Sequence, residues 1–318
     1  MIAFSDLQRD DQRMTDSSTG KFTAECALIG AVLLMMAGCS SVPKESRLLA
    51  PGPDGQVVVT RQHVGCVVPE SEASSGTGMQ ALDPRSIRLL SWNIHKTSDP
   101  GWEVDLARYA AENDLLLLQE AVLNAPLREL FKRQGYSWEM VGAFTSGGLE
   151  RGVLVAARTV PVSGRALCTY EPLFPLSKSA IVTRYHLVGS RKMLAVANLH
   201  GINFSLGMGR FRQQLQAVAR ELRQHDGSVI FGGDFNSWSP KRQEVLEMEA
   251  KRLGLVELEL NPDNRRIAFG RHLDHLFIRG FSAVNARSPE VKSSDHNPLL
   301  VTLIARHEEP ENRAGSRH

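Results

Sequence analysis

Residues 229–240 read VIFGGDFNSWSP, and this stretch sets the pattern on which the chain is organised. An apolar run that ends at Gly-Gly is typical of a buried strand reaching its end. Phe235 separates Asp234 from Asn236, and side chains two apart in an extended chain share a face. The stretch therefore predicts a strand with a carboxylate and an amide at its carboxyl end. The alternative is an Asx-rich loop that caps the next helix, a role that Ser237 or Ser239 could also fill.

Five further segments repeat this pattern, because each places an acid, an amide or a histidine at or inside an apolar strand. Any one of them is explained by an Asx turn or by a hydrogen-bonded core histidine. Six together require a common explanation, since buried polar groups are costly unless they bind one another or a ligand. The five are 89–93 (LLSWN), 115–120 (LLLLQE), 194–200 (LAVANLH), 272–278 (HLDHLFI) and 293–301 (SSDHNPLLV).

The polar groups of these segments favour one chemistry. Asn93, Glu120 and Asp295 are oxygen donors with no cysteine among them, and such a set suits Mg²⁺ or Mn²⁺. A histidine beside a carboxylate is the arrangement of a general base with its orienting group. A divalent cation, such a pair and amide donors together indicate cleavage of a phosphoester by water.

Strands and helices alternate between about residues 84 and 306. Helical apolar spacing covers 102–113 and 209–224, and short apolar runs indicate strands between the helices. The chain has no glycine-rich dinucleotide loop or Walker loop, which argues against the common nucleotide-binding α/β folds. We expect one α/β domain over 84–306, with two mixed β-sheets packed face to face and helices outside. Residues 307–318 are expected to form a disordered tail.

Six blocks resemble the endonuclease/exonuclease/phosphatase superfamily, in its order: SWNIH, LLLLQEA, NLHGINF, GGDFNSW, LDHLF and SSDHNPLLV. That superfamily includes pancreatic-type deoxyribonuclease, abasic-site endonucleases, bacterial sphingomyelinases and inositol polyphosphate 5-phosphatases. The blocks span about 87–303, and GDFN with SDHNP at this separation is their most specific part. The sequences of these blocks are most similar to those of a small bacterial subgroup of the superfamily. The resemblance implies a four-layer α/β sandwich of the deoxyribonuclease I type, with its site at the loops above the two sheets.

The resemblance also implies roles for the metal ligands and the base. Glu120 matches the principal metal ligand, and Asn93 and Asp295 match residues that complete or relay the metal shell. His296 matches the histidine that activates the attacking water. Asp274 matches its buried orienting acid.

Four further positions match residues that contact the substrate. Asp234 matches the acid that positions water or assists the leaving group, and Asn236 the amide that holds a phosphate oxygen. His200 lies where deoxyribonuclease-like members carry a histidine, and Asn203 resembles a further phosphate contact. His95 and Lys96 lie where the larger families differ, so their roles stay open.

Other polar residues near the blocks are interpreted as structural or as surface. His275 alternates with Asp274 and is expected to face away from the site. Most of the neighbouring basic side chains are expected to be solvated, with some at the rim of the site. These are Arg151, Lys178, Arg184, Arg265, Arg266 and Arg271.

The amino end has the pattern of an exported lipoprotein. Residues 26–38 form an uncharged apolar run that is too short to span a bilayer and fits a signal peptide. The run meets Cys39, and the junction resembles a bacterial lipobox with an outer-membrane sorting signal. We expect 1–38 to be a lipoprotein signal peptide, lipidated Cys39 to anchor the chain in the outer membrane, and 39–83 to be a flexible tether. The alternative is a buried helix with an incidental cysteine in a cytoplasmic protein.

Composition and cysteine content add few limits. The net charge of +2 over 318 residues is too weak a bias to indicate nucleic-acid binding by itself. Cys66 and Cys168 remain after the predicted processing, and an exported chain can join them, although their spacing alone does not show it.

We expect a metal-dependent phosphoester hydrolase, specifically a monomeric, nuclease-like phosphodiesterase acting on DNA or RNA. A phosphodiesterase or phosphatase for phospholipid head groups is an alternative. The alternative from another functional class is a non-catalytic envelope lipoprotein with the same fold. Absence of one of the expected catalytic groups would indicate that alternative. Every expected acid, amide and histidine is present.

Overall fold

The structure is a computed structural model that describes residues 46–52, 54–62, 81–171, 176–205 and 207–306. The chain divides into two units, 1–41 and 42–318, and all described residues belong to the second. The predicted signal peptide, Cys39 and the predicted tail lie outside the described residues, and so does Cys66. The described Cys168 carries a free thiol. Among the helices of the described ranges, none is long and apolar enough to cross a membrane.

The first sheet has eight strands, and β3 and β4, the third and fourth in its order, are parallel. Asn93 ends β3 and pairs with Gln119 of β4, which is followed by Glu120, so these polar groups lie at the same edge of the sheet. The order is β15 (Phe281–Arg287), β16 (Leu299–Ala305), β3 (Ile87–Asn93), β4 (Leu115–Val122), β6 (Leu149–Ala157), β5 (Ser137–Ser146), β1 (Ser46–Pro51) and β2 (Val57–Gln62).

The second sheet has six strands, and its parallel pair is β9 and β10. Antiparallel β14 lies on the other side of β10 and sets Asp274 opposite Asp234. A separate two-stranded hairpin, β12 (Ile267–Ala268) with β13 (Arg271–His272), precedes β14. The order is β11 (Val256–Glu257), β14 (Asp274–Arg279), β10 (Val229–Asp234), β9 (Leu194–His200), β8 (Leu176–Tyr185) and β7 (Ser163–Glu171).

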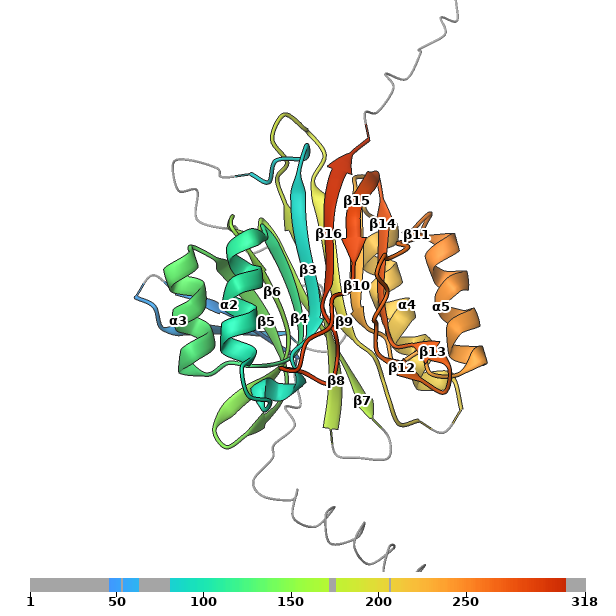
Figure 1. Cartoon of the computed structure of the whole chain (residues 1–318), viewed down its shortest axis with the longest axis horizontal. Helices are drawn as coiled ribbons and strands as arrows, with labels where there is room; N and C mark the ends of the chain where they lie inside the picture. Colours follow the sequence, from blue (N-terminus) through green and yellow to red (C-terminus); the bar gives the residue numbers. More distant parts are fainter. Residues whose placement is uncertain (1–45, 53, 63–80, 172–175, 206, 307–318) are drawn as a thin grey trace, which may run out of the picture. The chain divides into compact units, whose positions relative to one another are not determined.

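Three apolar clusters separate four layers. One joins the facing sides of the two sheets and includes Leu117 and Ile230. The second packs the first sheet against α2 (Trp102–Glu112) and α3 (Ala125–Gln134). The third packs the second sheet against α4 (Gly209–Arg223) and α5 (Pro240–Arg252). Figure 1 shows the two helix pairs on opposite sides of the paired sheets. The expected four-layer sandwich with two mixed sheets is therefore confirmed.

A polar bridge joins the two sheets beside the strand ends. The Gln119 side-chain amide donates to Asn198 Oδ1 at 2.7 Å. The Asn198 amide in turn donates to the backbone oxygens of Leu118 and Leu154, both at 2.9 Å. Both side chains are fully buried. Because a buried amide without partners is costly, this bridge fixes how the sheets align where they carry polar groups.

The Gly-Gly pair of the opening stretch is a packing requirement. Gly233 has φ 140°, and a Cβ there would collide with the backbone oxygen of Leu199 on β9. At Gly232 a Cβ would press into the Leu276 side chain. Glycine therefore lets β10 approach both neighbouring strands closely.

The helix after this stretch is capped by Ser239, whose hydroxyl accepts from the backbone N–H of Arg242. Pro240 occupies its first turn, as is typical of helix starts. Asp234 instead ends β10, and the Asn236 side chain bonds elsewhere. The helix-cap interpretation therefore applies to Ser239 and not to the acid–amide pair.

The predicted tether is corrected where the structure describes it. Residues 46–51 and 57–62 form strands β1 and β2, and β1 pairs with β5 of the first sheet. Leu48 and Leu49 are buried by this pairing. Their burial outweighs the polar, glycine-containing composition that suggested a flexible segment.

Candidate active site

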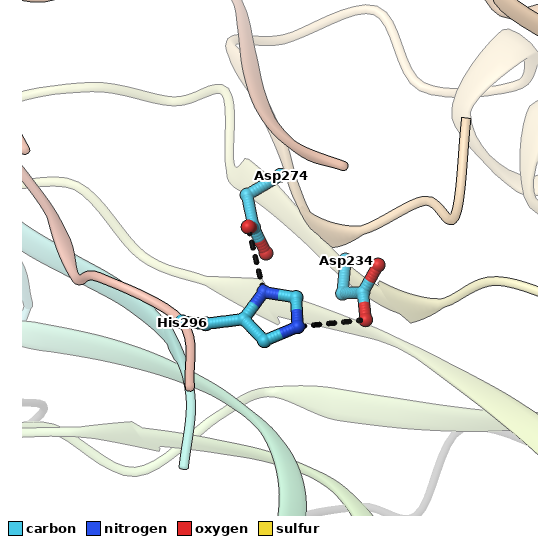
Figure 2. A group of neighbouring side chains, drawn as sticks. All are labelled: Asp234, Asp274 and His296. Atoms are coloured by element: carbon cyan, nitrogen blue, oxygen red, sulfur yellow. Dashed lines mark hydrogen bonds and ion pairs between the residues drawn. The ribbon is translucent and has the colours of Figure 1, made fainter. Parts of the chain in front are cut away.

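A histidine lies between two aspartates at the end of the second sheet (Figure 2). Nδ1 of His296 donates to Asp274 Oδ2 at 2.7 Å, and its Nε2 lies 3.9 Å from Asp234 Oδ2. All three residues are buried. Asp234 and Asp274 are register partners on β10 and β14, whereas His296 comes from the loop before β16. Strand pairing therefore brings together groups that lie far apart in the sequence.

The backbone around His296 is held by the first sheet. Trp92 Nε1 donates to the His296 backbone oxygen at 2.8 Å. Ser294 Oγ accepts from the His296 N–H and donates to the Asn93 backbone oxygen. These bonds place the imidazole at the junction of the sheets, and Asp274 fixes the proton on Nδ1.

The surrounding carboxylates favour the charged imidazole. Burial alone would lower the pKa of His296. The charge and hydrogen bond of Asp274, with the charges of Asp234 and Asp295, outweigh burial and raise the pKa of His296 to about 10. The ring therefore carries protons on both nitrogens at neutral pH until these carboxylates are neutralised.

Asp234 is the common partner of the site. Asn93 Nδ2 donates to its Oδ2 at 3.0 Å, and the Asn236 backbone N–H donates to its Oδ1 at 2.9 Å. Nε2 of His200 lies 3.6 Å from Asp234 Oδ2. Asn236 adopts a left-handed φ of 50°, and its amide donates to the Gly201 backbone oxygen at 3.0 Å. Non-glycine residues in this region are uncommon and gather at functional sites.

Glu120 has a second left-handed backbone, with φ 51° at an irregularity in the β4–β6 ladder. Its Oε2 lies 3.0 Å from Lys96 Nζ, and its Oε1 lies 3.6 Å from His200 Nε2. Burial raises the pKa of Glu120, but at the low pH where Glu120 titrates His200 is protonated, and the charges of His200, Lys96 and Lys178 outweigh burial and lower the pKa of Glu120 to about 2. Glu120 is thus a mostly buried anion held in the site at neutral pH.

Lys178 on β8 reaches the same group. Its Nζ lies 2.7 Å from His200 Nε2. Burial lowers the pKa of His200 to about 4, and the Lys178 charge acts in the same direction. The imidazole of His200 is therefore neutral at neutral pH, and its Nε2 accepts from the Lys178 ammonium.

The three expected metal ligands are only partly brought together. Asn93 is engaged twice, because its Oδ1 accepts from the His95 N–H and its Nδ2 donates to Asp234. Asp295 is half-exposed and forms an ion pair with Arg266 at 3.0 Å. Glu120 Oε2 is buried and lies 3.0 Å from the Lys96 ammonium, and within the described residues it accepts no hydrogen bond from any other group. Such an oxygen, in a set without thiolates, fits a hard divalent cation.

Asn203 lies to one side of this group. Its Oδ1 accepts from Trp238 Nε1 at 3.1 Å, and its backbone N–H donates to Glu171. Within the described ranges, no hydrogen bond joins the Asn203 side chain to Asp234 or His296.

The family model described as "Endonuclease/Exonuclease/phosphatase family" matches residues 90–296. This chain belongs to the endonuclease/exonuclease/phosphatase family. The match runs from β3 to His296, so it encloses all the site residues described above. The resemblance inferred from the sequence blocks is therefore confirmed, and the family is one of phosphoester hydrolases.

Relatives of known sequence and structure agree with this membership. A UPF0294 protein of Vibrio parahaemolyticus is 37% identical over 229 residues, which is 71% of this chain and 81% of the relative. An endonuclease/exonuclease/phosphatase from Beutenbergia cavernae superposes with a TM-score of 0.56 at 19% identity, over 70% of this chain and 72% of that one. The human nocturnin catalytic domain superposes with a TM-score of 0.52 at 19% identity, over 71% and 97%. The two structures show that the fold is shared.

Two lysines lie among the site residues described above, although the sequence analysis did not assign them to the site. Lys178 belonged to a set of basic residues of which most were expected to be solvated and some to lie at the rim of the site, and it is half-buried against His200. The available signal was a lone lysine inside a strand-like run. Lys96 was left open, and it pairs with Glu120 because three consecutive left-handed residues, 95–97, turn the chain back after β3.

Arg242 is a further residue that sequence reasoning missed. Its buried guanidinium donates to the backbone oxygens of Ile202, Asn203 and Asn236. It therefore ties the segment after β9 to the segment after β10. An arginine on a helix ordinarily indicates a solvated face, so nothing local predicts this role.

His275 is buried and faces away from the site, as expected from its alternation with Asp274. Its ring bonds to Ser237 Oγ at 2.7 Å and to Glu257 Oε1 at 2.6 Å.

Proposed function

We propose that this chain is a divalent-metal-dependent phosphodiesterase that cleaves its substrate with water. The observation that carries the proposal is the His296 imidazole set between Asp274 and Asp234. A buried histidine with an orienting acid on one nitrogen presents the other nitrogen for proton transfer. Membership of a family of phosphoester hydrolases supports the same reaction class.

Glu120, with Asn93 and Asp295, would hold Mg²⁺ or Mn²⁺. Such a cation, when bound, polarises a phosphoryl oxygen and stabilises the charge that develops on it. Neutralising carboxylates near His296 also opposes the shift of its pKa to about 10. The unprotonated Nε2 that a general base needs then becomes available nearer neutral pH.

The residues of the chain carry the proton and orient the phosphate. Asp274 fixes the His296 ring, and Nε2 takes a proton from the attacking water. The water oxygen bonds to phosphorus, the ester P–O bond breaks, and the leaving oxygen takes up a proton. Asp234 positions the water or assists the leaving group. Asn236 and Lys178 offer donors to the phosphate oxygens.

A nuclease-like diester substrate, DNA or RNA, is our leading proposal. A phospholipid head group or a phosphate monoester remains the alternative within the same chemistry. Attachment to the outer membrane through lipidated Cys39, and action as a monomer, are further proposals. Fractionation of cells that express wild type or Cys39→Ser tests the attachment, because loss of the lipid should release the protein from the membrane.

A substrate panel tests the proposed function. The chain is incubated with plasmid DNA, RNA, sphingomyelin and phosphoinositides in Mg²⁺, with His296→Ala as the inactive control. We expect turnover of nucleic acid that His296→Ala abolishes. Turnover of a lipid alone would select the alternative substrate. No turnover of any phosphoester by folded protein would favour a non-catalytic envelope protein.

A further inference from the structure

The hairpin that leads into catalytic strand β14 has an unexpected turn residue. Ala268 pairs with Arg271, so Phe269 and Gly270 form a two-residue turn. Both have positive φ, 50° and 75°, as in a type I′ turn. Asparagine, aspartate or glycine is favoured at the first of these positions, whereas a bulky aromatic residue is strained there.

Burial of the side chain does not offset the backbone strain at Phe269. The residue is 87% exposed, the highest value among the exposed large hydrophobic residues of the described ranges. Its ring lies 5.8 Å from the ring of Trp238, with the two planes tilted by 58°. A residue that breaks a local rule without a packing gain indicates a functional constraint.

Trp238 is held firmly in place. Its Nε1 donates to Asn203, and the Arg242 guanidinium lies 4.5 Å from its ring centroid. It lies two residues beyond Asn236, which is proposed to contact the phosphate. One of the two rings is therefore fixed on the segment that carries the proposed phosphate contact.

The hairpin is also tied to the catalytic loop. Arg266, just before β12, forms the ion pair with Asp295, the residue next to His296. Its backbone oxygen accepts from the N–H of Leu273, which precedes Asp274. The position of Phe269 is thus coupled to the same groups that hold the base and its orienting acid.

We propose that Phe269 and Trp238 form a stacking platform for an unpaired nucleobase next to the scissile phosphate. The inference rests on the proposed phosphodiesterase function and names its substrate class as single-stranded nucleic acid. Every base has a flat π face that stacks on an aromatic ring, and a paired base inside a duplex does not offer that face. A ring this exposed, beside the site, suits a base attached to the cleaved strand.

The charges around the platform favour a base over a cationic lipid head group. A quaternary ammonium group binds aromatic faces that are free of other cations. Here the Arg242 guanidinium already lies over the Trp238 ring, Arg266 directly precedes the hairpin, and Arg271 lies in its second strand. A nucleobase is neutral and its phosphate backbone is anionic, so the arginines do not repel it.

The test uses a substitution that removes the ring and suits the turn. Phe269→Asn places a favoured residue at the first position of the turn, so its melting temperature should equal or exceed that of wild type. Phe269→Trp keeps an aromatic ring. Ile267→Thr is the matched control, because Ile267 is also an exposed apolar residue of the hairpin.

Binding is measured in the His296→Ala background with Mg²⁺, so that hydrolysis does not interfere. The probe is a fluorescein-labelled single-stranded hexanucleotide, compared with the same backbone carrying abasic residues. Phe269→Asn should weaken binding of the hexanucleotide by roughly 5- to 100-fold, the range of one base–aromatic stack, and leave the abasic probe unchanged. Phe269→Trp should bind like the parent, and so should Ile267→Thr.

Two outcomes overturn the platform. The first is equal weakening of both probes, or no weakening, in Phe269→Asn. The second is loss of binding to sphingomyelin vesicles in Phe269→Asn and Ile267→Thr alike, with the hexanucleotide unaffected, which would make the hairpin a lipid contact. Hydrolysis of bis-(p-nitrophenyl) phosphate by wild type in Mg²⁺ is assayed in parallel. Its presence shows that the proposed function stands when the platform fails, and its absence shows that the function itself fails.

Discussion

Replacing Asp274 with asparagine removes the charge that orients His296 while keeping the shape of the side chain. The pKa of His296 is raised from 6.5 to about 10. A shift of this size corresponds to about 5 kcal/mol of preference for the charged ring, and several carboxylates contribute to it. Breaking a buried ion pair typically costs about 3–5 kcal/mol. We therefore expect Asp274→Asn to lower the free energy of unfolding by about 2–4 kcal/mol near pH 6.

The loss should depend on pH in a stated direction. The folded-state pKa of His296 lies above its ordinary value, so this stabilisation is fully present below pH 6.5. It disappears as the pH rises towards 10, because the ring then loses its proton in both states. Urea denaturation of wild type and Asp274→Asn, in EDTA, should show a difference that shrinks between pH 6 and pH 10.

The matched control is Asp83→Asn, which breaks an ion pair between exposed side chains and should leave the free energy of unfolding nearly unchanged. In activity assays, Asp274→Asn should lower kcat by on the order of 10²–10⁴. The double variant with His296→Ala should be little worse than His296→Ala alone. A stability difference that is the same at both pH values, or losses in kcat that add independently, would refute the pairing.

Substitutions at three further positions probe other parts of the structure. Burial raises the pKa of Glu139 to about 7, so the folded state loses stability as the pH rises from about 5 to 8. In urea denaturation at pH 8, Glu139→Gln should raise the free energy of unfolding by up to about 3 kcal/mol. No gain in the free energy of unfolding would contradict the burial argument. Asn236→Asp should hydrolyse substrate more slowly than Asn236→Ala, because it sets a second carboxylate beside Asp234 and the phosphate; unchanged activity would remove the amide from the site. Arg242→Met should lower the free energy of unfolding by about 2–4 kcal/mol. Arg242→Lys should be destabilised as well, because one ammonium group cannot reach three carbonyl oxygens. Wild-type stability in Arg242→Lys would show that the positive charge alone matters.

The strand pattern made the fold and the centre of the site predictable. Each proposed catalytic group follows, interrupts or precedes an apolar run, so Asp234, Asp274 and His296 could be placed on or next to strands before any contact was known. Strand pairing then decides which ends meet, and β10 with β14 brings the two aspartates into register. The family blocks added the roles that spacing alone does not give.

Residues whose position depends on tertiary contacts were not predictable. Arg242 is held by hydrogen bonds to buried backbone carbonyls, and Lys178 by a hydrogen bond to His200. These partners are distant in sequence or become buried only in the folded chain, so no local pattern indicates them. Asp295 turns to Arg266 because the hairpin before β14 folds back over the catalytic loop. The strands at 46–51 and 57–62 form because an open sheet edge accepts them, which composition alone does not reveal.

The central claim is that a divalent cation held by Glu120 supports hydrolysis of a phosphodiester at this site. The most direct measurement is the turnover of bis-(p-nitrophenyl) phosphate in Mg²⁺, in excess EDTA, and after Mg²⁺ is restored, by wild type and Glu120→Gln. We predict turnover that falls to background in EDTA, returns with Mg²⁺, and drops in Glu120→Gln by on the order of 10²-fold or more. Full activity in excess EDTA, or a Glu120→Gln variant as active as wild type, would contradict the claim.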